Sequence, residues 1–398
     1  MTRVLALAGR RPSGVDRVCL AYLRAVLADD VPCFGLVRTG LGYVLLDQIG
    51  MRTCLEAIEG QRDWPAPDFV SRLRHRAGSP RRVPDTMARQ MAIARARPRG
   101  LGRMLRRYLP TGSVYLNVDQ TTFTTRVARA VKRVKGGKIT VFLHDTIPLD
   151  HPQYQTPKSV EKLAAILKRC ASYADLILTN SHVSASDITR HMAPLGEVPP
   201  VEVAHLGVED DLFESENNDV SVSVAAPYLL CLGTIEPRKN IGFLLDLWEG
   251  MAERFPASEM PHLVIAGRRG WESVDVLARL ESSPLRGQFL LEFNDLGDLE
   301  LKSLMAGAAG LLFPSHAEGF GLPPVEAAAM GVPVVANTLP VLREILGDYP
   351  IYASVSDVYL WETIIQSLVT AQEAEKEANP RFSPPTWEAH FNTVLRVT

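Results

Sequence analysis

The stretch SHAEGFGLPPVEAAAMGVPVVA, residues 315–336, decides the fold of this sequence. It follows the short apolar run LLFP, and Gly319 and Gly321 let the backbone turn where that run ends. Pro323 and Pro324 then favour the start of a helix, where a missing N–H has no cost. Gly331 and Pro333 end the helix before the apolar run VVA. A strand, a loop, a helix and a second strand in this order predict an α/β fold with a parallel sheet.

Two carboxylates in this stretch are placed to meet one ligand. Glu318 lies in the predicted loop, and Glu326 lies in the first turn of the predicted helix, with seven residues between them. The N-terminus of a helix carries unpaired N–H groups and partial positive charge, which suit a phosphate or a polyhydroxylated ligand. Carboxylates can accept hydrogen bonds from the hydroxyls of such a ligand. The alternative is an ordinary strand-loop-helix unit, in which Glu326 only complements the helix dipole.

A second glycine turn, GTIEPRKN at residues 233–240, comes earlier in the chain. Gly233 ends an apolar run, and Arg238 with Lys239 stands at the entry to the next predicted helix. Arginine can bind two phosphate oxygens at once and lysine adds a compact charge, so the pair suits a diphosphate. Unpaired surface cations are common, and the pattern by itself only suggests such a site.

These segments together resemble family 4 of the retaining GT-B glycosyltransferases, also called the group 1 glycosyl transferases. GTIEPRKN is similar to the family's G-x-x-x-x-R-K-N segment, and Glu318 with Glu326 is similar to its Glu-x7-Glu signature. HDTIPLDHPQY, which begins at His144, resembles the HD-x-x-P segment of bacterial members. The chain is therefore identified as similar to the bacterial mannosyltransferases of this family.

The resemblance implies a GT-B fold, in which two Rossmann-like domains with doubly wound parallel sheets face each other across a cleft. The sequence has apolar runs for such sheets, the first at residues 4–8, but no G-x-G-x-x-G dinucleotide motif. Residues 1–207 are expected to form the acceptor-binding domain, and residues 228–378 the domain that binds the nucleotide sugar. The acidic and polar residues 208–227 are the expected linker. Residues 379–398 are expected to form a helix that returns to the first domain.

The resemblance also implies which residues act at the cleft. His144, Glu318, Arg238 and Lys239 are expected at the reaction centre, with Asp145 as the residue that orients His144. The expected donor-binding residues are Gly14, Gly233, Arg238, Lys239, Gly267, Glu318, Gly319, Phe320, Gly321, Leu322 and Glu326. No residue is expected to bind a metal.

The implied activity is transfer of a hexose from a nucleotide diphosphate sugar, with retention of configuration and without a metal. Mannose from GDP-mannose is the first expectation, and UDP-hexoses follow. The expected acceptor is a cell-envelope glycan or a lipid-linked acceptor, as in polysaccharide or lipopolysaccharide synthesis. The nucleotide sugar is a substrate, so no cofactor is expected. The alternatives are a non-catalytic nucleotide-sugar-binding subunit, and a sugar-nucleotide epimerase or a phosphorylase on a GT-B scaffold.

Composition argues against several other classes of protein. The 398 residues carry a formal net charge of −2, and no apolar run approaches the roughly 20 residues that a membrane-spanning helix needs. Five cysteines, an odd number without C-x-x-C spacing, argue against a disulfide framework or a zinc site. Nine histidines show no H-E-x-x-H pattern. The chain is expected in the cytoplasm.

One segment departs from this balance of charge. Between Arg72 and Arg107 there are twelve arginines and a single acid, Asp85. Such a block is either a solvated helix face or partly ordered loop, or a dock for anionic lipid headgroups or a phosphorylated lipid acceptor. The second interpretation would place the protein peripherally on the inner face of the cytoplasmic membrane. Nucleic acid is not expected as a partner, because no aromatic interleaving or nucleic-acid motif accompanies the arginines.

Overall fold

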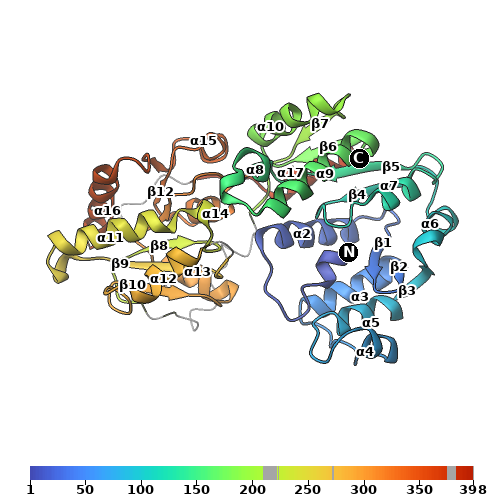
Figure 1. The fold of residues 1–398 in the computed structure, drawn as a ribbon, viewed down its shortest axis with the longest axis horizontal. Helices are drawn as coiled ribbons and strands as arrows, with labels where there is room; N and C mark the ends of the chain where they lie inside the picture. The colour runs from blue at the N-terminus through green and yellow to red at the C-terminus, as the bar shows by residue number, and fades with distance from the viewer. Residues whose placement is uncertain (209–221, 223, 271–272, 374–381, 398) are drawn as a thin grey trace.

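The computed structural model describes residues 1–208, 222, 224–270, 273–373 and 382–397. Within these residues the chain forms three β-sheets, and two of them are parallel and covered by helices (Figure 1). The two parallel sheets lie in different halves of the chain. The predicted α/β fold with two Rossmann-like domains is therefore confirmed. None of the described helices is long and apolar enough to span a membrane.

The larger parallel sheet belongs to the second half of the chain and has the strand order β10-β9-β8-β11-β12-β13. Its strands are β8 (Tyr228–Leu232), β9 (His262–Ala266), β10 (Leu290–Phe293), β11 (Gly310–Phe313), β12 (Val334–Ala336) and β13 (Ile351–Tyr352). Its helices are α11 (Ile241–Arg254), α12 (Val274–Ser282), α13 (Asp298–Ala306), α14 (Leu322–Ala329), α15 (Pro340–Leu346) and α16 (Val358–Glu373). After β10 the chain crosses to the other side of β8, so the carboxyl ends of β8 and β11 meet at the switch point. Open α/β sheets bind their ligands at this place.

The smaller parallel sheet lies in the first half of the chain and has the order β4-β5-β6-β7. Its strands are β4 (Val114–Asn117), β5 (Lys138–Phe142), β6 (Leu176–Thr179) and β7 (Val201–Val203). The helices of this region are α2 (Gly14–Ala28), α6 (Leu101–Tyr108), α7 (Thr125–Val131), α8 (Ile147–Asp150), α9 (Pro157–Tyr173) and α10 (His182–Met192). The four strands coincide with apolar runs in the sequence, and each parallel crossover is long enough to carry helices.

The first hundred residues differ from the prediction. The apolar run at residues 4–8 is expected to be a strand, but the chain forms the short helix α1 (Thr2–Leu5) and then a turn. Val4 and Leu5 are buried in a cluster with residues of α2, so the run is buried without pairing to a sheet. A short apolar run fits a buried helix as well as a buried strand, which explains the error.

An antiparallel sheet, which the sequence did not indicate, occupies this region instead. Its strands pair in the order β1-β2-β3. The sheet consists of β1 (Gly35–Thr39), β2 (Gly42–Leu46) and β3 (Ala92–Ala96), and it is accompanied by α3 (Gln48–Ile58), α4 (Phe69–Arg74) and α5 (Arg82–Gln90). The arginine-rich segment therefore forms ordered helices and a strand at one end of the molecule (Figure 1).

The last helix, α17 (Trp387–Val397), packs on the first half of the chain (Figure 1). The His390 ring lies 2.9 Å from the carbonyl oxygen of His205 through Nδ1 and 2.8 Å from the Tyr22 hydroxyl through Nε2. The Phe391 ring meets the Tyr22 ring edge to face, with centroids 5.1 Å apart. These contacts hold the end of the chain on α2. Most of the expected linker, residues 208–227, lies outside the described residues.

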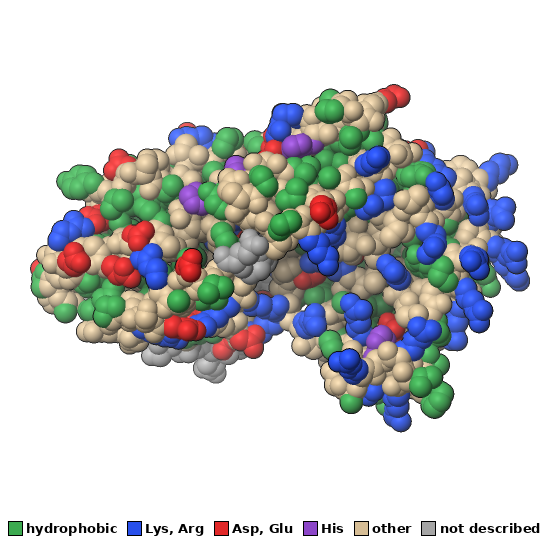
Figure 2. Space-filling model, in the orientation of Figure 1, with side chains coloured by type: hydrophobic (Ala, Val, Ile, Leu, Met, Phe, Trp, Pro, Cys, Tyr) green, Lys and Arg blue, Asp and Glu red, His purple; other side chains and the backbone are tan. Residues whose placement is uncertain are grey.

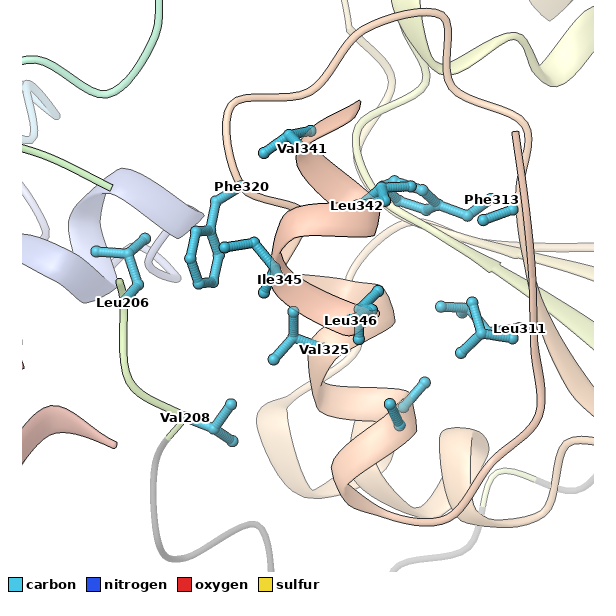
Figure 3. Close-up of a cluster of buried hydrophobic side chains, with 14 of the residues drawn as sticks. Leu206, Val208, Leu311, Phe313, Phe320, Val325, Val341, Leu342, Ile345 and Leu346 are labelled. Atoms are coloured by element: carbon cyan, nitrogen blue, oxygen red, sulfur yellow. The ribbon is translucent and has the colours of Figure 1, made fainter. Parts of the chain in front are cut away.

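One hydrophobic core crosses the contact between the two halves (Figure 3). Phe320, in the loop after β11, lies between Leu206 of the first half and Ile345 of α15 (Figure 3). The Phe320 side chain is 4% exposed. Full burial of a phenylalanine is worth about 1.5–3 kcal/mol, so this contact helps to hold the loop against the first domain.

Candidate active site

Arg238, Lys239 and Glu318, which are predicted to bind the donor, meet at the switch point of the larger sheet. Gly233 follows β8, and a single 3-10 turn, Pro237–Lys239, leads into α11. The loop of residues 314–321 follows β11 and leads into α14. The backbone N–H of His316 donates to the carbonyl oxygen of Arg238 at 2.9 Å, which joins the two loops. The cations of the first loop therefore face the acid of the second.

Close contacts with neighbouring atoms explain three of the predicted glycines. Gly321 has φ 90° and precedes α14, and a Cβ there would lie 2.6 Å from Leu342 Cδ2. A Cβ on Gly267 would lie 1.9 Å from the carbonyl oxygen of Gly233, so only glycine lets the ends of β9 and β8 come together. A Cβ on Gly233 would lie 3.1 Å from Cε of Lys239. Gly233 thus makes room for the lysine, and Gly267 makes room for the backbone of Gly233.

Glu318 is held by both cations of the 3-10 turn. Lys239 Nζ lies 2.7 Å from Oε1, and Arg238 Nη1 lies 2.8 Å from Oε2. Arg238 also donates to the carbonyl oxygen of Ala317 and to Oε1 of Glu236, each at 2.6 Å. These four charged side chains are at most 15% exposed. They form a buried cluster of two cations and two acids, which we call the donor cluster.

Two members of the donor cluster, Glu318 and Arg238, hold each other in the charged form. Burial would raise the pKa of Glu318, but the charges of Arg238 and Lys239 outweigh burial and lower the pKa to about 2. Burial would lower the pKa of Arg238, but the charges of Glu318 and Glu236 raise it above its ordinary value. The acids therefore occupy positions in which an anionic ligand could replace them.

The second acid of the signature, Glu326, contacts the other half of the molecule. Its Oε1 lies 2.6 Å from Arg17 Nη1, and Arg17 comes from α2 of the first domain. The Glu326 side chain is 7% exposed. Gly14, at the start of α2, lies against Leu322, because a Cβ on the glycine would lie 3.6 Å from Leu322 Cδ1. The first turn of α2 and the first turn of α14 thus face each other.

His144 lies just beyond the carboxyl end of β5, on the first-domain side of this contact. Its Nε2 lies 2.9 Å from the carbonyl oxygen of Val118. A carbonyl oxygen can only accept, so Nε2 carries the hydrogen and, in the neutral ring, Nδ1 is left as an acceptor. Burial lowers the pKa of His144 to about 4, so the ring is neutral at pH 7.

The residue that orients His144 differs from the prediction. Asp145 is expected to hold the imidazole, but its Oδ1 accepts the backbone N–H of Ile147 at 3.0 Å, and the Val118 carbonyl holds the ring instead. The Asp145 carboxyl faces the loop of residues 314–321, which we call the donor loop. A Cβ on Gly319 would lie 3.0 Å from Asp145 Cβ and 3.1 Å from its Oδ2. Burial raises the pKa of Asp145.

The donor loop is also tied to the first domain by hydrogen bonds. Ser181, which caps the N-terminus of α10, donates from Oγ to the carbonyl oxygen of Gly319 at 3.3 Å. Ser184 donates to the same oxygen at 3.4 Å. The loop that carries Glu318 and Gly319 therefore lies along the contact between the domains. Sequence reasoning missed Glu236 and Arg17 as members of the site, although Glu236 stands inside the GTIEPRKN motif and Arg17 stands three residues after Gly14.

Comparison with known proteins shows which proteins this chain resembles. Residues 226–369 match the family described as glycosyl transferases group 1. The chain is 33% identical over 239 residues to O-antigen chain mannosyltransferase B of Escherichia coli. This match covers 58% of this chain and 61% of that protein. It is 28% identical over 235 residues to the serotype-specific mannosyltransferase WbdA of Escherichia coli, covering 56% of this chain and 28% of that protein. The matches thus span less than two thirds of the length of these relatives.

Solved structures share the fold. The crystal structure of Anabaena Alr3699/HepE in complex with UDP and glucose superimposes with a TM-score of 0.54 at 18% identity, covering 76% of this chain and 81% of that one. At this identity the likeness concerns the fold alone. Residues 226–369 thus match the group 1 glycosyl transferases, and the chain has the two-domain GT-B fold and is similar in sequence to bacterial mannosyltransferases.

Proposed function

We propose that this protein is a glycosyltransferase that moves a hexose from a nucleoside diphosphate sugar to a cell-envelope glycan or a lipid-linked acceptor. The observation that carries the proposal is the donor cluster, in which Arg238 and Lys239 are buried at the switch point of the group 1 domain. The names of the relatives, O-antigen chain mannosyltransferase B and WbdA, support mannose as the sugar and GDP-mannose as the first donor to test.

In the proposed reaction the bond between the sugar and the diphosphate breaks, and negative charge grows on the leaving oxygen. Arg238 and Lys239 are fixed in place before the donor arrives, so they stabilise that charge without reorganisation. A bound diphosphate would take over their hydrogen bonds, and Glu318 would turn towards the hydroxyls of the sugar. Two cations can balance the diphosphate, and we therefore propose a transfer that needs no metal.

We further propose that the configuration at the anomeric carbon is retained, through attack from the side of the leaving group. In the donor complex Glu318 would accept hydrogen bonds from sugar hydroxyls, so it is poorly placed to take the proton of the acceptor as well. The donor phosphate becomes more basic as its bond to the sugar breaks, and it takes that proton instead. The neutral His144 presents Nδ1 as an acceptor for a sugar hydroxyl.

Glu326 is proposed to bind the ribose of the donor. Arg17 now lies 2.6 Å from this carboxylate, so ribose hydroxyls would have to replace the guanidinium. Donor binding would then break one contact between the domains. Binding of the nucleotide and opening of the contact would be linked for this reason.

The arginine-rich segment divides into structural and exposed members. Arg89 is buried and donates from Nη2 to Oδ1 of Asp68 at 2.6 Å, and this hydrogen bond lowers the pKa of Asp68 to about 2. Arg82 donates to the carbonyl oxygen of His75. The remaining arginines are exposed on α4, α6, β3 and the turns beside them. Figure 2 shows Lys and Arg side chains gathered over this end of the molecule.

This exposed surface supports docking on an anionic membrane as part of the proposed function. Phe69 and Leu73, one turn apart on α4, are 79% and 77% exposed. Arg72 and Arg76 are exposed beside them. Two apolar side chains can enter the lipid interface while arginines meet anionic headgroups. We propose that the protein meets a lipid-linked acceptor peripherally at the inner face of the cytoplasmic membrane.

The proposed function is tested by transfer from a panel of labelled sugar nucleotides. Purified protein is incubated with GDP-, UDP-, ADP- and dTDP-sugars and with lipid-linked glycan acceptors, and the anomeric configuration of the product is measured by NMR. We expect transfer from one donor, most readily GDP-mannose, with retention and in the presence of EDTA. Lys239→Met should abolish transfer, and Lys158→Ala, an exposed lysine of α9, is the matched control. Hydrolysis or epimerisation without transfer would contradict the proposal.

A further inference from the structure

Three side chains that can bind a metal meet where the two domains touch, outside the donor cluster. His182 is the first residue of α10, His205 follows β7, and Glu344 lies in α15. Each offers one ligand atom, and these three atoms all lie within 4.8 Å of one another. The two histidines belong to the first domain and the glutamate belongs to the second.

Two of the three side chains are already held in position. His205 Nε2 lies 2.9 Å from Oε1 of Glu344. The glutamate accepts the backbone N–H groups of His182 at 2.6 Å and Val183 at 3.0 Å. The backbone of His205 is fixed as well, because its carbonyl oxygen accepts from the His390 ring. Metal-binding carboxylates are commonly fixed by such outer hydrogen bonds.

The third side chain is available to complete a site. His182 is exposed, and its ring makes no hydrogen bond with any residue that the structure describes. The ring stands perpendicular to that of His205, with centroids 6.0 Å apart. Glu344 caps the N-terminus of α10 and pairs with His205, and these contacts explain its position. Neither contact involves the imidazole of His182. Rotation of this exposed side chain would bring its nitrogen onto an ion shared with the other two.

We propose that His182, His205 and Glu344 bind a zinc ion between the domains. Two imidazoles and one carboxylate are a ligand set that zinc uses, with bonds of about 2.0–2.2 Å and a fourth position for water. The exposure of His182 leaves that fourth position open to solvent. Magnesium prefers oxygen ligands, so a site with two imidazoles favours zinc over magnesium.

Zinc at this place would hold the domains together. It would link α10 and the loop after β7 to α15, and the His205 ring lies 6.4 Å from that of Phe320 in the donor loop. If donor binding must separate Arg17 from Glu326, a bound zinc ion would oppose that step. Zinc would therefore inhibit transfer, and this consequence, unlike zinc binding itself, rests on the proposed function.

The site is tested by calorimetric titration of the metal-free full-length chain with zinc chloride. We expect one saturable site with a roughly micromolar dissociation constant, and a loss of about tenfold or more in His182→Ala. His191→Ala, on the same helix, is the matched control, because Arg190 still pairs with the Asp150 that His191 contacts. His182→Ala keeps the backbone N–H that caps Glu344, so it should fold normally. Absence of saturable binding, or equal affinity in the two variants, would overturn the proposal.

A second measurement separates the site from its consequence. Zinc should raise the melting temperature of the wild-type chain but not that of His182→Ala, because only the wild-type site joins the domains. It should inhibit transfer by the wild type at concentrations that leave His182→Ala active. Zinc binding without inhibition would overturn the link to donor binding and leave the site intact. A chain without transfer activity would contradict the proposed function, and the titration would still decide the zinc site.

Discussion

The two halves of the molecule use arginine in opposite ways. In the second domain Arg238 is 15% exposed and contacts Glu318, Glu236 and the Ala317 carbonyl. In the first domain Arg106 and Arg107 of α6 point into solvent. A buried cation is fixed, and its removal leaves its partners with unpaired charge, whereas water and salt screen an exposed one. Burial, rather than residue type, therefore distinguishes arginines that can stabilise charge in a reaction from arginines that can bind an anionic membrane surface.

Removal of the buried arginine should have the largest effect. Arg238→Ala leaves Glu318 and Glu236 short of positive charge, so we expect a loss of about 3–5 kcal/mol in unfolding free energy and loss of nucleotide binding. Urea denaturation followed by tryptophan fluorescence measures the first, and thermal shift with nucleotides measures the second.

The matched control is Arg126→Ala on α7, an exposed arginine whose loss should change stability by less than about 0.5 kcal/mol. If the two variants were equally stable and both bound nucleotide, burial would not distinguish the two kinds of arginine. Lys239→Met provides a second test of nucleotide binding should Arg238→Ala fail to fold.

Buried histidines sharpen the comparison through pH. Burial lowers the pKa of His144 and of His390 to about 4, so both stay neutral in the folded chain down to that pH, while the unfolded chain takes up protons near 6.5. The stability that these neutral rings contribute is present above pH 6.5 and is lost as the pH falls from 6.5 to 4. We expect a fall on the order of 1–3 kcal/mol for each ring. Urea denaturation at pH 7 and pH 5 measures this. The unfolding free energy of His144→Asn should fall less between these pH values than that of the wild type, and an equal fall would contradict the prediction.

The contact between the domains should give a smaller effect of opposite sign. Arg17→Met removes the cation that occupies Glu326, so we expect nucleotide affinity to rise by less than about tenfold, whereas Arg238→Ala lowers it. Calorimetry with GDP and UDP measures both variants, and Arg17→Lys is the conservative control that should stay near wild type. Weaker binding by Arg17→Met would mean that Arg17 contacts the donor directly.

The exposed arginines should have the smallest effect on stability. The combined change Arg72→Glu with Arg76→Glu, beside Phe69 and Leu73, should leave unfolding free energy within about 1 kcal/mol of wild type. It should weaken binding to vesicles that contain anionic lipid, by about 1 kcal/mol or more for each charge removed. Vesicle sedimentation at low and high salt measures this, with neutral phosphatidylcholine vesicles as the control. Equal binding of the wild type and the variant to anionic vesicles would contradict the proposed docking on the membrane.

The second domain could be predicted in detail because its signals are local. Gly321 with Pro323 and Pro324 marks the start of α14, and the structure begins that helix at Leu322. Arg238 and Lys239 stand on one short turn, so their convergence on Glu318 required only that β8 and β11 be neighbours. The structure places these two strands side by side. The sequence analysis placed the two motifs at one site through their resemblance to the GT-B family, because local periodicity does not give the order of strands in a sheet.

The remaining features depend on contacts between distant residues, and the sequence could not specify them. The run at residues 4–8 is apolar, and a short apolar run fits a buried helix as well as a buried strand. Its hydrophobicity therefore did not identify its secondary structure. The Arg17 contact with Glu326 joins two domains across more than three hundred residues. His182, His205 and Glu344 come from three elements without motif spacing, which is why the histidine pattern indicated no metal.

The central claim is that Arg238 and Lys239 bind the diphosphate in place of Glu318. Calorimetry with GDP tests this claim most directly. Glu318→Gln frees Arg238 and Lys239 from their competitor, so this variant should bind GDP more tightly than the wild type although it loses transfer. UDP and ADP serve as further ligands in the same titration. Unchanged or weaker binding by Glu318→Gln, for every nucleotide that the wild type binds, would contradict the claim.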